Sequence, residues 1–158
     1  MRQTKSKKII TKKTEYIPMT NIKSTNCGIN IIEGSIRGFD ITTSQYIDYS
    51  FMIDKYYQLN TNIQISLILE TKLNDSNKLV KFKLDMKQLN NPSNSIEHEF
   101  EMLPEGSITN EVIHSFKLKK IEENQIYMCR LTRVRVPNGH LNGVWIHGIK
   151  LQYNVSNC

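Results

Sequence analysis

Apolar residues recur at every second position along most of the chain after residue 28, in short runs separated by polar turns. The clearest run alternates polar residues with four apolar ones, Ile63, Ile65, Leu67 and Leu69. A period of two is typical of a pleated strand with one buried face. No long stretch shows the period of an α-helix, so the pattern predicts an all-β protein.

Further runs of the same period span residues 29–33, 46–53, 80–86, 96–102, 112–118, 126–136 and 145–155. Together they predict about eight strands, with turn residues at intervals typical of β-sandwiches. We expect a two-sheet antiparallel sandwich and favour a jelly roll. An immunoglobulin-like sandwich is the competing topology.

Two pairings follow from the order and the charges of these runs. A turn-rich segment at 74–77 separates the runs 63–69 and 80–86 and predicts a hairpin between them. The polar face of 80–86 carries lysines, whereas the polar face of 96–102 carries glutamates, so these two runs are expected to pair. The charged residues concerned are Lys81, Lys83, Glu97, Glu99 and Glu101.

The run 126–136 changes phase within its length. Tyr127, Cys129 and Leu131 share one parity, while Val134 takes the other. A β-bulge near Leu131 would reconcile the two and would leave Arg133 outside the sandwich.

The last run places Trp145 and His147 on the same parity as Ile149 and Tyr153. This pattern predicts that Trp145 is buried in the core. The same argument predicts that His98 and His114, which lie on the apolar parity of their runs, are core or interface histidines rather than metal ligands.

Composition indicates one folded domain behind a charged segment. The chain has 158 residues, of which 39% are hydrophobic and 23% charged, a balance typical of globular proteins. Its net charge of +6 lies in residues 1–23, which hold seven cations against the single acid Glu15, while the remainder balances 14 against 14. We therefore predict a basic N-terminal arm over 1–25 and a sandwich domain over 26–158. The seven cations are Arg2, Lys5, Lys7, Lys8, Lys12, Lys13 and Lys23.

Such an arm suits contact with nucleic acid or with an acidic protein surface, because neutralising phosphates needs no sequence readout. The competing interpretation is that the charged residues stay solvated and keep the protein soluble.

Three cysteines at wide spacing, Cys27, Cys129 and Cys158, fit neither a disulfide framework nor a zinc site. We expect free thiols, with Cys129 buried, and assembly in a reducing cytoplasm. No apolar run is long enough to span a membrane, and no signal peptide precedes the domain, so no membrane partner is expected.

The residues show no catalytic pattern. A nucleophile elbow, a phosphate-binding glycine loop and a metal-ligand spacing are all missing from the sequence, which predicts a protein that is not an enzyme and has no cofactor. Glu97, Glu99 and Glu101 could pair as glycosidase carboxylates, but a solvated strand face explains them better. The candidate ligand loops contain Tyr56, Tyr57 and His140.

The stretches 46–53, 62–71 and 143–153 resemble small jelly-roll domains of tailed-bacteriophage virion proteins, such as head decoration, head fibre or tail-associated subunits. This resemblance implies a virion structural protein that assembles with itself and with other subunits in the host cytoplasm. One alternative is a carbohydrate-binding module that uses Tyr56, Tyr57 and His140. The other is a capsid protein that contacts nucleic acid through the arm.

Overall fold

The computed structural model describes residues 7–24, 27–32, 35–71, 78–103, 108–122, 125–139 and 144–157. They form eleven strands and one short 3-10 helix, and none of them lies in an α-helix. No helix among them is long and apolar enough to cross a membrane. The elements are β1 (Ile9–Tyr16), η1 (Met19–Asn21), β2 (Lys23–Ser24), β3 (Gly28–Ile32), β4 (Ser35–Ile41), β5 (Tyr46–Met52), β6 (Ile63–Thr71), β7 (Val80–Gln88), β8 (Asn91–Met102), β9 (Thr109–Phe116), β10 (Ile126–Val134) and β11 (Val144–Asn157).

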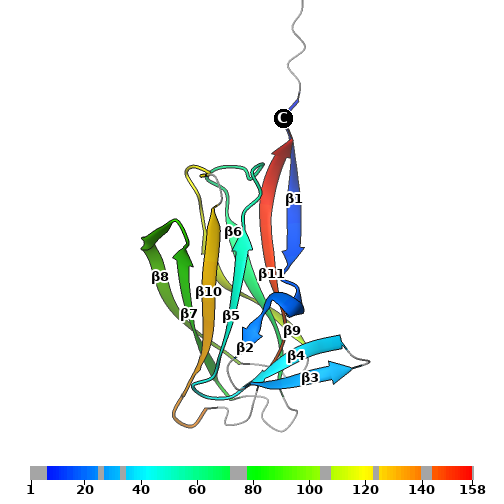
Figure 1. Cartoon of the computed structure of the whole chain (residues 1–158), viewed down its shortest axis with the longest axis vertical. Coiled ribbons are helices and arrows are strands. Elements are labelled where there is room, and N and C mark those ends of the chain that lie inside the picture. Colours follow the sequence, from blue (N-terminus) through cyan, green and yellow to red (C-terminus); the bar gives the residue numbers. More distant parts are fainter. Residues whose placement is uncertain are drawn as a thin grey trace, which may run out of the picture.

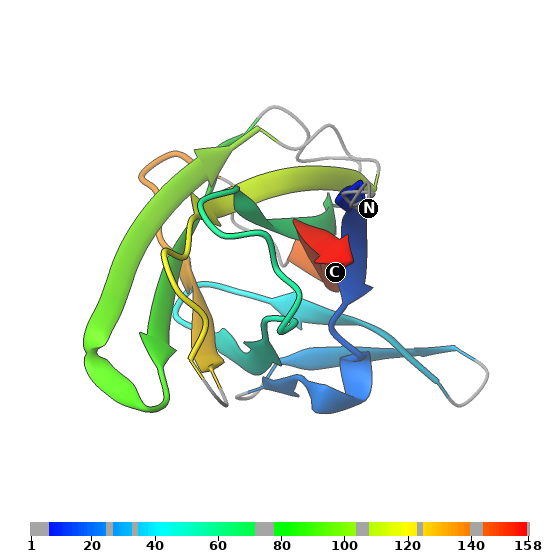
Figure 2. The same ribbon diagram turned by 90° about the horizontal axis from the view of Figure 1, so that it is seen from above.

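The strands form two antiparallel sheets that face each other (Figure 1). Sheet A has the order β3-β4-β11-β6-β9, with β1 also paired to β11, and sheet B has the order β2-β5-β10-β7-β8. Seen along the strands, the two sheets enclose a common interior (Figure 2). The predicted all-β, two-sheet sandwich is confirmed. The strands that the sequence did not predict are β1, β2 and β4, and β4 pairs with β3.

Strand partners differ in part from the prediction. β6 lies in sheet A and β7 in sheet B, so the predicted hairpin between them is wrong. Alternation reveals a strand and its buried face, but it does not say which sheet the strand joins. The pairing of β7 with β8 is confirmed, and Lys81 and Lys83 each lie 2.8 Å from a glutamate of β8.

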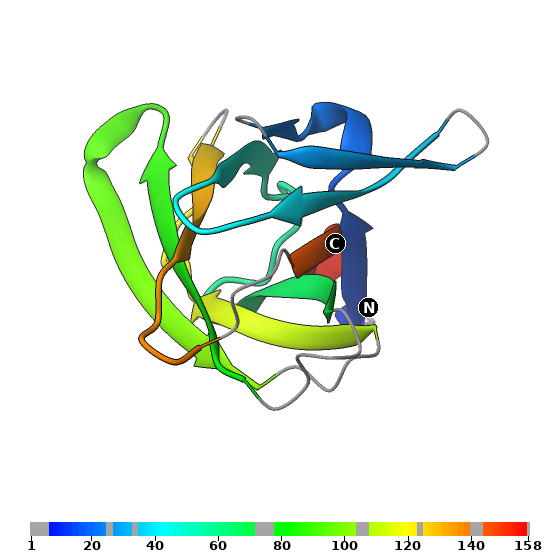
Figure 3. The same ribbon diagram turned by 90° about the horizontal axis from the view of Figure 1, so that it is seen from below.

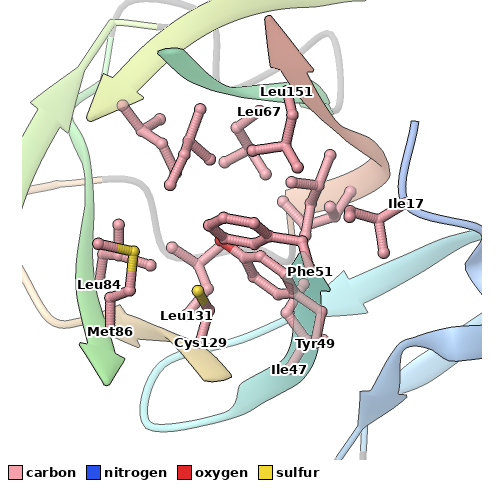
Figure 4. Packing of buried hydrophobic residues seen from close by; sticks show 14 of the residues in the cluster. Ile17, Ile47, Tyr49, Phe51, Leu67, Leu84, Met86, Cys129, Leu131 and Leu151 are labelled. Atoms are coloured by element: carbon pink, nitrogen blue, oxygen red, sulfur yellow. The ribbon is translucent and has the colours of Figure 1, made fainter. Parts of the chain in front are cut away.

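The core lies between the inner faces of the two sheets (Figure 4). Leu131 of β10 and Leu84 of β7 are fully buried on the sheet B side, opposite Leu67 and Leu151 of sheet A. Buried aliphatic side chains of this kind contribute about 1.5–3 kcal/mol each through the hydrophobic effect. Every second residue of the central strands is therefore committed to packing, and the alternate residues form the outer faces.

β10 runs without a bulge, so the predicted bulge near Leu131 is wrong. Arg133 occupies the next inward position and is only 2% exposed. Its Nη1 donates to the carbonyl of Ile41 at 3.3 Å, and its guanidinium lies 5.8 Å from the ring centre of Phe82. The predicted outward position of Arg133 is wrong, because a long arginine side chain can lie inside the sandwich when its donors find acceptors.

A bulge occurs instead in β11, between Ile146 and Gly148. Ile146 is buried before the bulge and Ile149 is buried after it, so the buried parity changes within the strand. Trp145 is consequently half-buried on the outer face of sheet A, and its predicted place in the core is wrong. His147 is the extra residue, and its Nε2 lies 2.7 Å from a carboxylate oxygen of Glu70.

Much of the predicted N-terminal arm is a strand. β1 pairs with β11 from Ile9 opposite Asn157 to Tyr16 opposite Lys150. The physical reason is that β4 pairs only with the first part of the long strand β11, which leaves backbone groups that β1 satisfies. The sandwich therefore starts at Ile9 rather than after residue 25.

Candidate functional site

The outer face of sheet B is hollowed by a trough of about 840 Å³. The strand register places its lining side chains in two rows that cross the sheet. One row reaches all five strands and is entirely charged: Lys23, Asp48, Arg130, Asp85 and Glu97. The next row contains Ser50, Met128, Lys87 and Ser95. We call these nine residues the sheet B trough.

Arg130 stands at the centre of the charged row and is held in a fixed orientation. Its Nε and one terminal nitrogen donate to the two carboxylate oxygens of Asp48, both at 2.8 Å. The guanidinium carbon lies 3.8 Å from the ring centre of Tyr46, which provides a cation–π contact. Asp48 raises the pKa of Arg130 further above its usual value. The remaining N–H donors have no partner among the described residues and can serve a ligand.

The two ends of the trough differ in how their charges are paired. Glu97 lies 2.8 Å and Asp85 lies 3.6 Å from Lys83, so the acids on β7 and β8 share one cation. Lys23 and Lys87, in contrast, make no ion pair with any residue that the structure describes. The trough thus combines carboxylates that are held in place by ion pairs with lysines that make no ion pair in the described part of the chain.

Two methionines give the same face an apolar surface. Met128 is 53% exposed within the trough, and Met52 on β5 is 56% exposed beside it. An exposed thioether side chain is flexible and can adapt to the shape of an apolar ligand face. The face therefore has a mixed character, with hydrogen-bonding groups around a small apolar area, and it is more polar than most small-molecule sites.

A second cavity of about 640 Å³ lies beside Lys13, Asp54 and Glu122. Its charges are already paired, because Lys13 Nζ lies 2.6 Å from both Glu15 and Asp54. We favour the sheet B trough because its donors are less engaged and because it stands on paired strands rather than on loops.

The Lys13–Asp54 pair predicts how stability depends on pH. The hydrogen bond from Lys13 lowers the pKa of Asp54 below its usual value of 3.8. A lowered folded-state pKa stabilises the fold above the unfolded pKa, and this stabilisation is lost as pH falls through the folded value. Asp54→Asn should therefore cost about 1 kcal/mol at pH 7 and almost nothing at the acid end, as measured by urea unfolding from pH 7 to pH 2. A constant difference across that range would contradict the assignment.

Of the predicted ligand residues, neither Tyr56 nor Tyr57 lines the trough. Tyr57 is buried, and its hydroxyl donates a hydrogen bond to the carbonyl of Thr61 and accepts one from the Leu118 amide. Tyr57 is therefore a core residue. Tyr56 is 47% exposed, with the ammonium group of Lys55 lying 4.9 Å from its ring centre. His140 lies outside the described residues. Among the described residues, Tyr56 is the predicted ligand residue that stays exposed, and its role and that of His140 stay predictions.

The structure describes five of the seven predicted polyanion contacts. Arg2 and Lys5 lie outside the described residues, whereas Lys7, Lys8 and Lys12 are exposed. Lys13 is engaged in its two ion pairs, and Lys23 belongs to the sheet B trough. Contact of these cations with a polyanion stays a prediction.

Other candidate chemistry is limited in the described part of the chain. Neither Cys27 nor Cys129 is in a disulfide, in agreement with the prediction for these two residues, and burial raises the pKa of the Cys129 thiol to about 12. Cys158 lies outside the described residues. No group of three or more histidine, cysteine or acidic side chains able to hold a metal occurs among the residues described.

Sequence reasoning missed the trough because its residues come from five separated segments. The alternation around residue 130 does show Met128 and Arg130 on the outward parity, and that signal was available. Their meeting with Asp48 and Lys87 depends on β10 lying between β5 and β7. Strand order was therefore the missing information.

Comparison with known proteins shows a similarity of fold. No protein-family model matches the sequence, and no curated protein sequence matches it significantly. Among solved structures, the chain resembles a xylan-binding module of family 15, with a TM-score of 0.52, 8% identity and coverage of 90% of this chain and 97% of the module. It also resembles a family 35 carbohydrate-binding module from Clostridium thermocellum, with a TM-score of 0.52, 7% identity and coverage of 88% and 97%.

A third match is to the Podospora anserina mannanase GH26-CBM35, with a TM-score of 0.50 and 11% identity. The match covers 93% of this chain but 28% of the mannanase. These neighbours overturn the resemblance to bacteriophage virion proteins and, with it, the virion structural function. Alternating strands and a terminal tyrosine, which carried that resemblance, are shared by many β-sandwiches. The sandwich itself is common to the chain and to carbohydrate-binding modules.

Proposed function

We propose that this chain is a non-catalytic module that binds a carbohydrate chain in the sheet B trough. The observation that carries the proposal is the trough itself, a cavity of about 840 Å³ on rigid strands with charged, hydroxyl and thioether side chains.

The composition of the trough matches the chemistry of sugars. A pyranose presents hydroxyl groups around its rim and C–H groups on its faces, so a binding site needs both hydrogen-bonding groups and an apolar surface. Asp48 and Asp85 are acceptors for hydroxyl groups, Arg130 is a donor, and Met128 offers the apolar surface. A flexible side chain that its neighbours already hold in place loses less conformational entropy when a ligand binds. Arg130 is held in this way by Asp48 and Tyr46.

The structural neighbours favour this ligand class over others. The module of family 15 is described as xylan-binding, and the family 35 module as carbohydrate-binding. Neither description concerns a catalytic domain, which agrees with the expectation that the chain is not an enzyme. The same fold with a polar trough on one outer face makes a polysaccharide the first ligand to test.

A binding screen tests the proposal. We expect the purified chain to be retarded in native gels that contain one or more soluble polysaccharides, and to bind a subset of a glycan array. The Met128→Ala variant should bind the same glycan several-fold more weakly, because it removes the apolar surface and leaves the charged row intact. The exposed Leu89→Ala variant, which alters an apolar residue that does not line the trough, is the matched control. A chain that folds but binds no glycan in either format would contradict the function.

A further inference from the structure

The sandwich is closed on one side by two strands that do not pair with each other. β8 is the last strand of sheet B and β9 is the last strand of sheet A. The two lie next to each other on the same side of the molecule (Figure 3). At this seam His98 of β8 meets His114 of β9, with ring centres 5.5 Å apart and ring planes inclined by 46°.

The two imidazoles are held by an aromatic row on either side. His98 stacks on Phe100, which stacks on Phe82 in β7. His114 stacks on Phe116, and the ring of Phe116 contacts that of Tyr127. Both imidazoles are therefore positioned by their neighbours, whereas the seam between the sheets has no backbone hydrogen bonds of its own among the described strand pairs.

One nitrogen of this pair lacks a partner. His114 Nε2 is buried, and no described residue forms a hydrogen bond with it. A buried polar atom without a partner costs about 1–3 kcal/mol, so two leucines would close the seam more favourably. Burial and the neighbouring His98 lower the pKa of His114.

The separation of the two ring centres is close to that of two imidazoles bound to one metal ion. With a metal–nitrogen distance of about 2.1 Å, each ring centre lies about 3.2 Å from the ion, and tetrahedral geometry places the two centres about 5.2 Å apart. The observed separation is 5.5 Å. Imidazole nitrogen suits Zn²⁺, Ni²⁺ and Cu²⁺, and water completes the coordination on the exposed side of His98.

We infer that His98 and His114 form a two-histidine site for a borderline transition-metal ion, which fastens sheet A to sheet B along the β8–β9 seam. This inference revises the prediction from sequence that both are core or interface histidines rather than metal ligands. The two histidines stand 16 positions apart in runs that belong to different sheets, so only the tertiary structure brings them together. The site is separate from the sheet B trough, since both histidines are on the inward parity of their strands and neither lines the trough.

Thermal unfolding of the metal-free chain with and without added ZnCl₂ or NiCl₂ tests this site. An ion that binds only the folded state raises Tm, and at a free-ion concentration of about ten times Kd we expect a rise of about 3–6 °C. MgCl₂ should give no rise, because Mg²⁺ prefers oxygen ligands. Calorimetric titration with NiCl₂ should give one ion bound per chain.

Alanine variants of single histidines test which residues bind the ion. His98→Ala should abolish the rise in Tm, and because His98 is exposed, this variant is expected to fold. His114→Ala should do the same, while His147→Ala, which alters a histidine paired with Glu70, should keep the full rise. The inference is overturned if the native chain shows no rise with either ion, or if His98→Ala keeps it. Glycan binding by the trough is unaffected in either case, so the two proposals fail independently.

Discussion

The Tyr153→Ala variant should lose about 3–5 kcal/mol of unfolding free energy, the usual range for deleting a large buried aromatic side chain. Tyr153 is 1% exposed, and its ring packs edge-on against that of Tyr57, with the ring centres 6.1 Å apart. Its hydroxyl accepts a hydrogen bond from the Asp54 amide at 3.2 Å. The variant therefore loses packing in the core and an anchor of the loop after β5, as chemical denaturation will measure.

Two companion variants separate these effects. Tyr153→Phe keeps the packing and removes the acceptor for the Asp54 amide, so it should lose only about 0.5–1.5 kcal/mol. Trp145→Ala should lose about 1–2 kcal/mol, because its side chain is half-buried on the outer face of sheet A. If Trp145→Ala proved as destabilising as Tyr153→Ala, the bulge in β11 would be misplaced.

The Arg130→Ala variant should weaken glycan binding by at least about tenfold, because a charged hydrogen-bond donor at the centre of a site contributes about 1.5–3 kcal/mol. Its unfolding free energy should change by less than about 1 kcal/mol, since the Arg130–Asp48 pair is largely exposed. Isothermal titration with the glycan found in the screen measures the first effect, and urea unfolding measures the second.

Matched substitutions show whether the geometry of Arg130 matters. Arg130→Lys keeps the charge but loses the two-fold contact with Asp48 and the planar stacking on Tyr46, so we expect most of the binding to be lost. Arg135→Ala removes an exposed arginine that does not line the trough, and it should bind like the native chain. Native binding by Arg130→Ala would rule out the trough as the site and leave the fold unchanged.

Alternation along the chain was sufficient for the fold class, because a buried face imposes a period of two wherever a strand covers a core. It predicted the strands around Ile65, Leu84 and Tyr127, and the charge pattern predicted the pairing of β7 with β8. Alternation gave wrong predictions where a polar side chain lies inside the sandwich or an apolar one lies on its outer face. Arg133 is inside although it is charged, and Trp145 is half outside although it is aromatic.

The basic segment shows the limit of reading charge along the chain. Seven cations near one end predicted a separate arm, yet Ile9 to Tyr16 complete sheet A beside β11. Backbone hydrogen bonding to an available strand edge does not depend on side-chain charge, so composition cannot exclude it. The cation Lys13 is accordingly part of an ion-pair cluster with Glu15 and Asp54.

Both proposed sites are products of tertiary structure. The sequence by itself determined an all-β chain, its approximate strands and the outward parity of Arg130, because each depends on local pattern or residue type. Only the tertiary structure decided that β10 lies between β5 and β7, which assembles the sheet B trough, and that β8 and β9 end their sheets on the same side. Strand order depends on the packing free energy of the whole sandwich, and residues distant in sequence meet only once that order is set.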